Sequence, residues 1–156
     1  VVYGEHGDAK ALVDLFAARK DADAIIMAQE VSSEVVDKYG IISFKDGTDN
    51  QLDNIIEKPE VGQAPSTLAS YGRYLLKPSI FDHLVPKYTG KDGELWTVDA
   101  ITKIAESGTV LVEKTKGQWL TTGDPENYFR AYLEFVIKFE KYGHKIPAWL
   151  EEIGGV

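Results

Sequence analysis

The sequence predicts an α/β fold within one domain over residues 1–156. Two patterns indicate this fold class. Residues 9–20 place apolar side chains at helical spacing, and residues 24–28 then form a short continuous apolar run that is typical of a buried strand. The length of 156 residues fits a single hydrophobic core, and 44% apolar with 27% charged residues is typical of a folded domain rather than a disordered one.

The first half of the chain reads as this helix among several strands. Residues 1–4 have the pattern of the end of a buried strand. Residues 39–44 predict a further strand, which the turn signal Lys45-Asp46-Gly47 closes, and residues 54–56 predict another that stops at Lys58-Pro59. Because only a short polar loop separates these two strands, we expect them to form a β-hairpin.

The second half adds more helices and strands. Residues 67–76 are rich in β-branched, aromatic and aliphatic side chains and predict a strand, and Pro78 fits the first position of a short helix through residue 84. Thr97 is expected to cap a helix that ends at a glycine cap, Gly108, and Asp124 before Pro125 is expected to cap a long helix. The remaining elements are strands at 109–112 and 118–120 and helical segments at 125–142 and 146–152.

Charge and composition exclude several classes of function. The chain has 17 Lys and Arg against 25 Asp and Glu, a net charge of −8, so its overall field repels nucleic acid and anionic lipid. It has no Cys and three scattered His, which excludes disulfides and thiolate sites and disfavours a zinc site. No apolar run reaches the roughly 18 residues that span a bilayer, and we expect a cytoplasmic protein.

A carboxylate and an ammonium stand where the strand at 54–56 ends. Glu57 has oxygens that can accept hydrogen bonds from sugar hydroxyls, and Lys58 has the charge to bind a phosphate. The alternative is an exposed ion pair at a strand end, which is a common and weak surface feature. Gly40 would let a ligand approach the backbone, although a simple turn also explains it, and residues 90–94 are either a lid or a solvated connection.

Several short motifs in a fixed order connect these residues. They are Tyr39-Gly40, Ile56-Glu57-Lys58-Pro59, Ala64-Pro65-Ser66-Thr67-Leu68-Ala69, Gly72-Arg73-Tyr74, Gly93-Glu94-Leu95, Asp99-Ala100-Ile101, and Gly123 with the helix after it. Over about residues 35 to 135, this series resembles the bacterial UTP-glucose-1-phosphate uridylyltransferases, which are nucleotidyltransferases of the nucleotide-sugar pyrophosphorylase type. The order and spacing of the motifs carry the resemblance, not any one of them.

The resemblance implies a Rossmann-like, three-layer αβα nucleotidyltransferase fold that is incomplete, because this chain corresponds to the C-terminal, sugar-binding half. It also implies transfer of a uridylyl group from UTP to glucose 1-phosphate, which gives UDP-glucose and pyrophosphate, with Mg²⁺ as the cofactor. By this resemblance Lys58 is the catalytic residue and holds the sugar phosphate. The implied sugar-binding residues are Gly40, Glu57, Gly72, Glu94 and Asp99. The chain is then expected to be inactive alone, with a missing N-terminal half as its partner.

The chain departs from this family at the implied metal site. The family's strand that ends in Gly-Asp reads Tyr3-Gly4-Glu5 here, so Glu5 would replace one metal-binding carboxylate. Thr121 stands where the family has a second metal-binding Asp, and the family's glycine-rich nucleotide loop has no counterpart in these residues. A noncatalytic sugar-phosphate-binding module is therefore the alternative, and the broad apolar face of residues 125–142 also permits a homo-oligomer.

Overall fold

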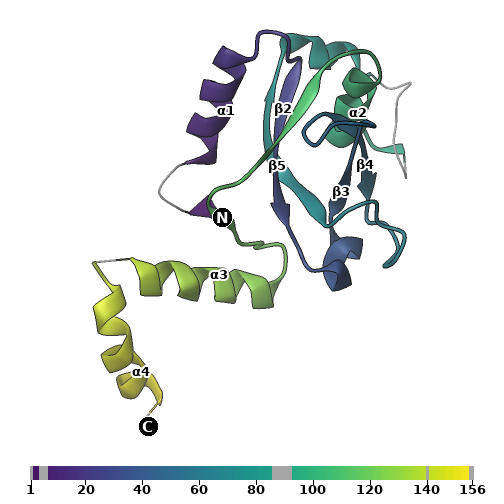
Figure 1. Ribbon diagram of the computed structural model, residues 1–156. Helices are drawn as coiled ribbons and strands as arrows, with labels where there is room; N and C mark the ends of the chain where they lie inside the picture. The colour runs from purple at the N-terminus through teal and green to yellow at the C-terminus, as the bar shows by residue number, and fades with distance from the viewer. Residues whose placement is uncertain (1, 4–6, 86–92, 140, 155–156) are drawn as a thin grey trace. The chain divides into compact units, whose positions relative to one another are not determined.

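A computed structural model of the chain describes residues 2–3, 7–85, 93–139 and 141–154 (Figure 1). The chain divides into two compact units. The larger unit spans Gly4–Gly117, and the smaller unit joins Val1–Tyr3 to Gln118–Val156. Among the described residues, every buried apolar side chain except Ala131 belongs to the larger unit, which therefore contains the core.

The larger unit contains a mixed five-stranded sheet with the order β4-β3-β5-β2-β6. Its strands are β2 (Ala24–Glu30), β3 (Gly40–Phe44), β4 (Leu52–Glu57), β5 (Leu68–Leu76) and β6 (Val110–Lys114). β2 and β6 run parallel, whereas the other neighbours are antiparallel. The predicted hairpin of β3 and β4 is confirmed. β4 and β6 are the two edge strands of this order, and Gln51, the residue before β4, forms an isolated β-bridge with Leu111 of β6. The two edge strands therefore approach each other at this point.

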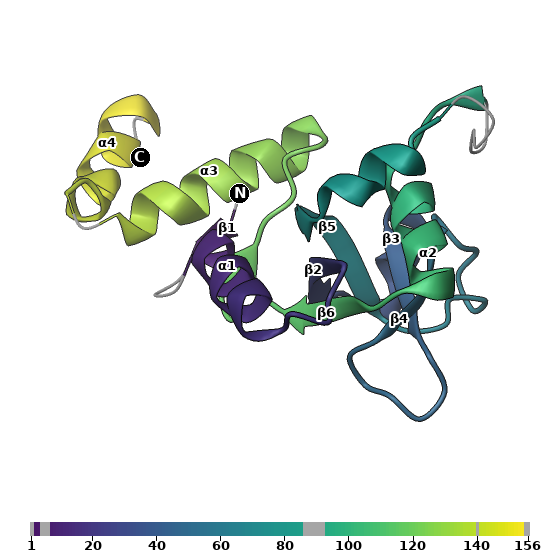
Figure 2. The ribbon, with the colours of Figure 1, turned by 90° about the horizontal axis from the view of Figure 1, so that it is seen from above.

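β2 is buried on both faces, which explains its unbroken apolar run. On one face, Ile25 and Met27 pack with Leu12 of α1 (Asp8–Ala18). On the other, Ile26 packs in a cluster that includes Ile101 of α2 (Thr97–Ser107). Figure 2 shows the sheet between these two helices. The larger unit therefore has three layers, helix, sheet and helix, as the family resemblance implies.

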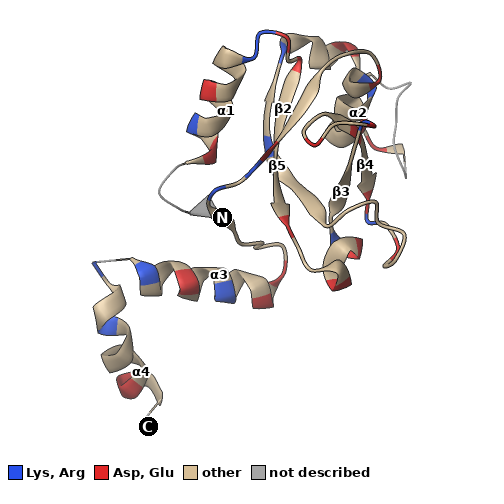
Figure 3. Cartoon of the chain, viewed as in Figure 1, with Lys and Arg blue, Asp and Glu red and all other residues tan. Residues whose placement is uncertain are grey.

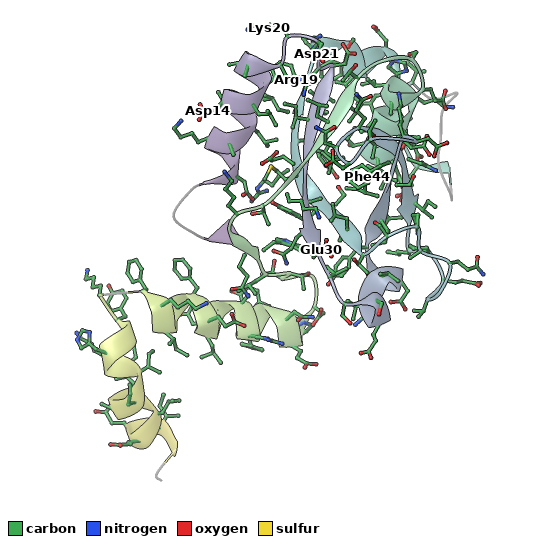
Figure 4. All side chains as sticks on the ribbon, viewed as in Figure 1. Asp14, Arg19, Lys20, Asp21, Glu30 and Phe44 are labelled. Atoms are coloured by element: carbon green, nitrogen blue, oxygen red, sulfur yellow. The ribbon has the colours of Figure 1, made fainter. Side chains whose placement is uncertain are left out.

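The cluster under α2 is the larger of the two main clusters of buried apolar side chains. It joins four residues of α2 to residues of every strand of the sheet, and Phe44, labelled in Figure 4, packs against it. The α2 residues are Ala100, Ile101, Ile104 and Ala105. Their spacing puts one apolar stripe of the helix against the sheet, as the sequence pattern predicts.

Both ends of α2 differ from the predicted caps. The helix begins at Thr97 and its N-cap is Trp96, so Thr97 does not cap it. Gly108 does follow the last turn, but its φ of −128° is extended rather than left-handed. A Cβ at Gly108 would lie 2.5 Å from Oδ2 of Asp23, so close packing requires the glycine.

The Asp23 carboxylate joins three segments of the larger unit. Its Oδ2 accepts a hydrogen bond from the backbone N–H of Thr109 at 3.0 Å, and its Oδ1 accepts one from Nζ of Lys77 at 3.0 Å. The backbone N–H of Asp23 also donates to the carbonyl of Thr109. The backbone hydrogen bond from Thr109, followed by that from Lys77, lowers the pKa of Asp23. This carboxylate therefore ties the start of β2 to the end of β5 and the start of β6.

The smaller unit contains a two-stranded antiparallel sheet and two helices. β1 (Val2–Tyr3) pairs with β7 (Gln118–Trp119), and the helices are α3 (Pro125–Lys138) and α4 (Ile146–Gly154). The predicted cap of α3 is confirmed, because Oδ1 of Asp124 accepts a hydrogen bond from the N–H of Asn127 at 2.9 Å. Figure 3 shows charges of both signs along α3, where Arg130 and Glu134 form an ion pair.

Short 3₁₀ helices complete the elements, at Ser33–Lys38, Pro78–Asp82 and Gly143–Lys145. The second of these begins at Pro78, as the sequence predicts. None of the described helices is both long enough and apolar enough to cross a bilayer.

The lowered pKa of Asp23 predicts an acid-dependent loss of stability. Asp23→Asn should lower the free energy of unfolding at pH 7 by about 1–2 kcal/mol, because two hydrogen bonds lose their charged acceptor. A lowered pKa stabilises the fold above the ordinary aspartate value, and this contribution is lost as the pH falls through the folded-state pKa. The difference between wild type and variant should therefore shrink below about pH 4. Urea unfolding at several pH values measures it, and a difference that stays constant with pH would contradict the assignment. The exposed Asp37→Asn is the control.

Candidate functional site

The hairpin brings two of the predicted site residues together. Gly40, the first residue of β3, pairs with Glu57, the last residue of β4. A Cβ at position 40 would lie 2.9 Å from Oε2 of Glu57 and 2.9 Å from Cγ2 of Ile55. The Glu57 carboxylate therefore occupies the space that the Cβ of any other residue at position 40 would need. Gly40 is required by this close approach rather than by a turn.

A row of paired residues runs across the whole sheet from Glu57. Gly40 pairs with Ser70 on its other side, Ser70 pairs with Ala28, and Ala28 pairs with Lys114. Directly opposed residues point to the same face of a sheet. Ala28 belongs to the cluster under α2, so the row lies on the α2 face. It has small side chains in the middle and a charge at each end.

Two hydroxyl groups on this face were not predicted as site residues. Ser70 Oγ and Tyr74 OH lie 3.1 Å apart and share a hydrogen bond. Tyr74 is part of the Gly72-Arg73-Tyr74 motif, and that motif could have marked it as a site residue. Nothing in the sequence marks Ser70, because its place beside Gly40 depends on the pairing of β3 with β5.

Lys58 follows β4 in an unusual backbone conformation. Its φ is 48°, in the left-handed region, and among the described residues it is the only non-glycine with a positive φ. Its N–H donates to the carbonyl of Tyr39 at 3.0 Å, which fixes this conformation next to the row. Such strain in a non-glycine residue often marks a functional site.

The predicted alternative, an exposed ion pair at the strand end, is not found among the described residues. Within the described part of the chain, neither Glu57 nor Lys58 takes part in an ion pair or a side-chain hydrogen bond. Glu57 is half-buried and Lys58 is exposed. A carboxylate and an ammonium at adjacent positions thus keep their hydrogen-bonding capacity for a ligand.

The other predicted sugar-binding residues lie on three elements. Gly72 is in β5, two residues after Ser70, with a φ of 77°. Asp99 is half-buried in the first turn of α2, the helix that covers the face of the row. Glu94 is exposed and accepts a hydrogen bond from Nε1 of Trp96 at 3.1 Å. Of the predicted lid at 90–94, residues 90–92 lie outside the described residues.

The implied Mg²⁺ needs hard oxygen ligands, usually carboxylates. Glu5 lies outside the described residues. Thr121 is in the smaller unit, where its Oγ1 accepts a hydrogen bond from the N–H of Gly123 at 3.4 Å, and both carboxylate oxygens of Asp124 bind Asn127. The described residues contain no group of three acidic or histidine side chains placed to hold a metal. On their own, therefore, they do not fit a resident Mg²⁺ site.

Comparisons with known proteins agree on one family. The family model described as nucleotidyl transferase matches residues 1–136. A UTP--glucose-1-phosphate uridylyltransferase of Pseudomonas aeruginosa is 40% identical over 110 residues, which cover 69% of this chain and 39% of that protein. One from Staphylococcus haemolyticus is 30% identical over 156 residues, which cover 99% and 54%. The chain thus spans about half the length, or less, of these relatives.

A solved structure is similar over nearly the whole chain. The UTP-bound UGPase from Acinetobacter baumannii matches with a TM-score of 0.81 and 28% identity, and the match covers 97% of this chain and 53% of that one. The predicted α/β nucleotidyltransferase fold is confirmed by this match together with the family model.

The contact between Gly40 and Glu57 predicts a cost for any side chain at position 40. Gly40→Ala should lower the free energy of unfolding by about 1–3 kcal/mol, because the new methyl group overpacks the strand pair. Chemical denaturation measures the change. Gly7→Ala is the control, since a Cβ there meets no atom within 4 Å. Equal stability of wild type and Gly40→Ala would contradict the close approach.

The positive φ of Lys58 predicts that glycine at this position stabilises the fold. Lys58→Gly should raise the free energy of unfolding by up to about 1 kcal/mol, because glycine adopts left-handed φ values without a Cβ clash. Lys58→Ala removes the charge but keeps the Cβ, so it is the matched control and should give no such gain. A loss of stability in Lys58→Gly relative to Lys58→Ala would show that residue 58 is not strained.

Proposed function

The chain belongs to the nucleotidyl transferase family, and from this premise we propose that it supplies the sugar-phosphate half of uridylyl transfer from UTP to glucose 1-phosphate. The products would be UDP-glucose and pyrophosphate. The observation that carries the proposal is the row from Glu57 over Gly40 to Ser70, with Lys58 beside it, which makes no ion pair with the described residues. The names of the relatives support the choice of substrates.

In this proposal the sugar lies at the Glu57 end of the row, because Glu57 and Ser70 are half-buried whereas Gly40 and Ala28 are buried. The Glu57 carboxylate, which has no partner among the described residues, accepts hydrogen bonds from hexose hydroxyls. The absence of a side chain at Gly40 leaves room for that carboxylate. The hydroxyls of Ser70 and Tyr74 both donate and accept, which suits a polyol. Gly72, Glu94 and Asp99 would border the bound sugar, as the family resemblance implies.

Lys58 would bind the phosphate of the same ligand. The net charge of −8 repels an anion from the chain as a whole, so a local cation must overcome that field. An ammonium that makes no ion pair among the described residues is available for this role, because binding the phosphate breaks no ion pair with any of them. The proposed site thus divides its work, with Glu57 at the sugar end and Lys58 at the phosphate end.

The proposed reaction is an in-line displacement. An oxygen of the sugar phosphate attacks the α-phosphorus of UTP, a new P–O bond forms, and the bond to pyrophosphate breaks. No covalent enzyme intermediate is needed, so the contribution of these residues is to position the sugar phosphate and to neutralise its charge. Because the described residues do not form a resident Mg²⁺ site by themselves, no step of this reaction is assigned to a metal here. A cytoplasmic location stays a prediction.

A second candidate is a noncatalytic sugar-phosphate-binding module. Thr121 favours it, because a hydroxyl stands at the position where the family resemblance implies a carboxylate. Both candidates bind glucose 1-phosphate, so turnover separates them. With UTP, glucose 1-phosphate and Mg²⁺ present, pyrophosphate release should stay at background for the chain alone. Release after the N-terminal half of a relative is added supports the enzyme, whereas binding without release in its presence supports the module.

If Lys58 binds the phosphate and Glu57 the sugar, loss of Lys58 should lower the affinity for glucose 1-phosphate more than the affinity for glucose. Lys58→Ala should weaken the binding of glucose 1-phosphate by about 10- to 100-fold, the range expected for a hydrogen bond to a charged group. The binding of free glucose should change little. Calorimetry with both ligands measures the two affinities, and Lys38→Ala, an exposed lysine at the end of a 3₁₀ helix, is the control. Equal losses for the two ligands would exclude Lys58 as the phosphate contact.

A further inference from the structure

β5 is irregular at the place where it meets the proposed site. Ser70 pairs with Ala28 of β2, but the next pair is Tyr74 with Ile26. The three residues 71–73 of β5 therefore stand opposite the single residue Met27 of β2. Gly72, at the centre of this bulge, has a φ of 77°, which a residue with a side chain rarely adopts. The bulge begins directly after Ser70, which pairs with Gly40.

Hydrogen bonds hold the bulge from both faces of the sheet. On the α2 face, the hydroxyls of Ser70 and Tyr74 bridge its two ends at 3.1 Å. On the α1 face, the hydroxyl of Tyr71 donates to Oδ2 of Asp8 at 2.6 Å. Asp8 is in the first turn of α1, and 63 residues separate it from Tyr71 in the sequence.

Asp8 is the only charged residue that is buried in the described part of the chain, with 5% of its surface exposed. Its Oδ1 accepts a second hydrogen bond from Oγ1 of Thr115 at 2.8 Å, and that hydroxyl accepts one from the N–H of Gly117. Burial, followed by the hydrogen bond to Asp8, raises the pKa of Tyr71, so its hydroxyl stays protonated and continues to donate. A buried carboxylate with two hydroxyl donors holds both donors in place. Loss of either donor is unfavourable, because it leaves part of a buried charge without a hydrogen bond.

We propose that the hydrogen bond from Tyr71 to Asp8 positions the hexose end of the site, by fixing the bulge and with it Ser70 and Gly40. Tyr71 and Asp8 are then positioning residues, because neither belongs to the row that would touch the sugar. The inference rests on the proposed function, since it concerns the same sugar site. The inference goes beyond the proposed function because it assigns a role to residues on the opposite, α1 face of the sheet.

The two ends of the ligand should respond differently to loss of this contact. Ser70 and Gly40 depend on the position of β5, whereas Lys58 follows β4 and is held by the carbonyl of Tyr39. A loosened bulge therefore disturbs the sugar contacts more than the phosphate contact. If the variant only lowered the stability of the fold, the affinities for glucose and for inorganic phosphate would fall together or would both stay unchanged.

The experiment is calorimetry of the full chain with glucose, glucose 1-phosphate and inorganic phosphate. Tyr71→Phe removes only the hydroxyl and should weaken the binding of glucose and of glucose 1-phosphate by about tenfold, the loss expected when a displaced Ser70 no longer makes one hydrogen bond to the sugar. Inorganic phosphate should bind Tyr71→Phe as it binds wild type. Asp8→Asn keeps one acceptor oxygen and should give a smaller loss in the same direction.

Thr48→Val is the control, because it removes a hydroxyl that donates to the carbonyls of Lys45 and Gln51 in the loop between β3 and β4, whereas the Thr115 hydroxyl also contacts Tyr71. The Thr48→Val variant should lower the unfolding midpoint as Tyr71→Phe does, yet bind glucose 1-phosphate like wild type. Equal affinity of wild type and Tyr71→Phe, or equal losses of affinity in Tyr71→Phe and Thr48→Val, would overturn the inference. The proposed function still stands in that case if wild type binds these ligands. If wild type binds none of the three ligands, the proposed function fails and the inference fails with it.

Discussion

The burial of β2 on both faces is the constraint from which the larger unit follows. Its side chains alternate between two clusters, and Ile25, Ile26 and Met27 are at most 1% exposed. A strand of this kind needs a strand at each edge and a helix on each face. β5 and β6 supply the edges, and α1 and α2 supply the covers. The same arrangement sets Asp8 of α1 over one face of β5 while α2 covers the other.

The candidate site is a consequence of how the hairpin joins this sheet. β3 adds to the free edge of β5 with Gly40 opposite Ser70, and β4 then sets Glu57 opposite Gly40. Because opposed residues share a face, one row collects a carboxylate, a position without a side chain and a hydroxyl from three strands. No single segment contains this combination. The site therefore depends on register, and a slip of one residue in either pair would turn Glu57 or Ser70 to the other face.

The sequence predicts what is local and misses what is distant. Hydrophobic spacing finds the helices and strands of the larger unit, and it finds the hairpin that pairs Gly40 with Glu57. Local pattern does not reveal the partner of Tyr71, because 63 residues separate it from Asp8. The sequence pattern does not reveal the bulge either. Two extra residues leave the alternation of side chains between the two faces unchanged, so the pattern of β5 is that of a regular strand. Only Gly72 hints at the bulge. The cap at Thr97 fails by one residue, since Trp96 occupies the cap position.

The strain at Lys58 and the charge of the whole chain have a common explanation in the proposed site. Folding alone favours glycine at a φ of 48°, so a lysine there lowers stability without improving the packing. In a regular strand, residue 58 would face away from Glu57, because successive side chains alternate. The left-handed conformation ends that alternation directly after Glu57. In a chain with a net charge of −8, an anion needs a cation close to the groups that bind the rest of the ligand. A lysine in this conformation meets that need beside Glu57, and a glycine would not.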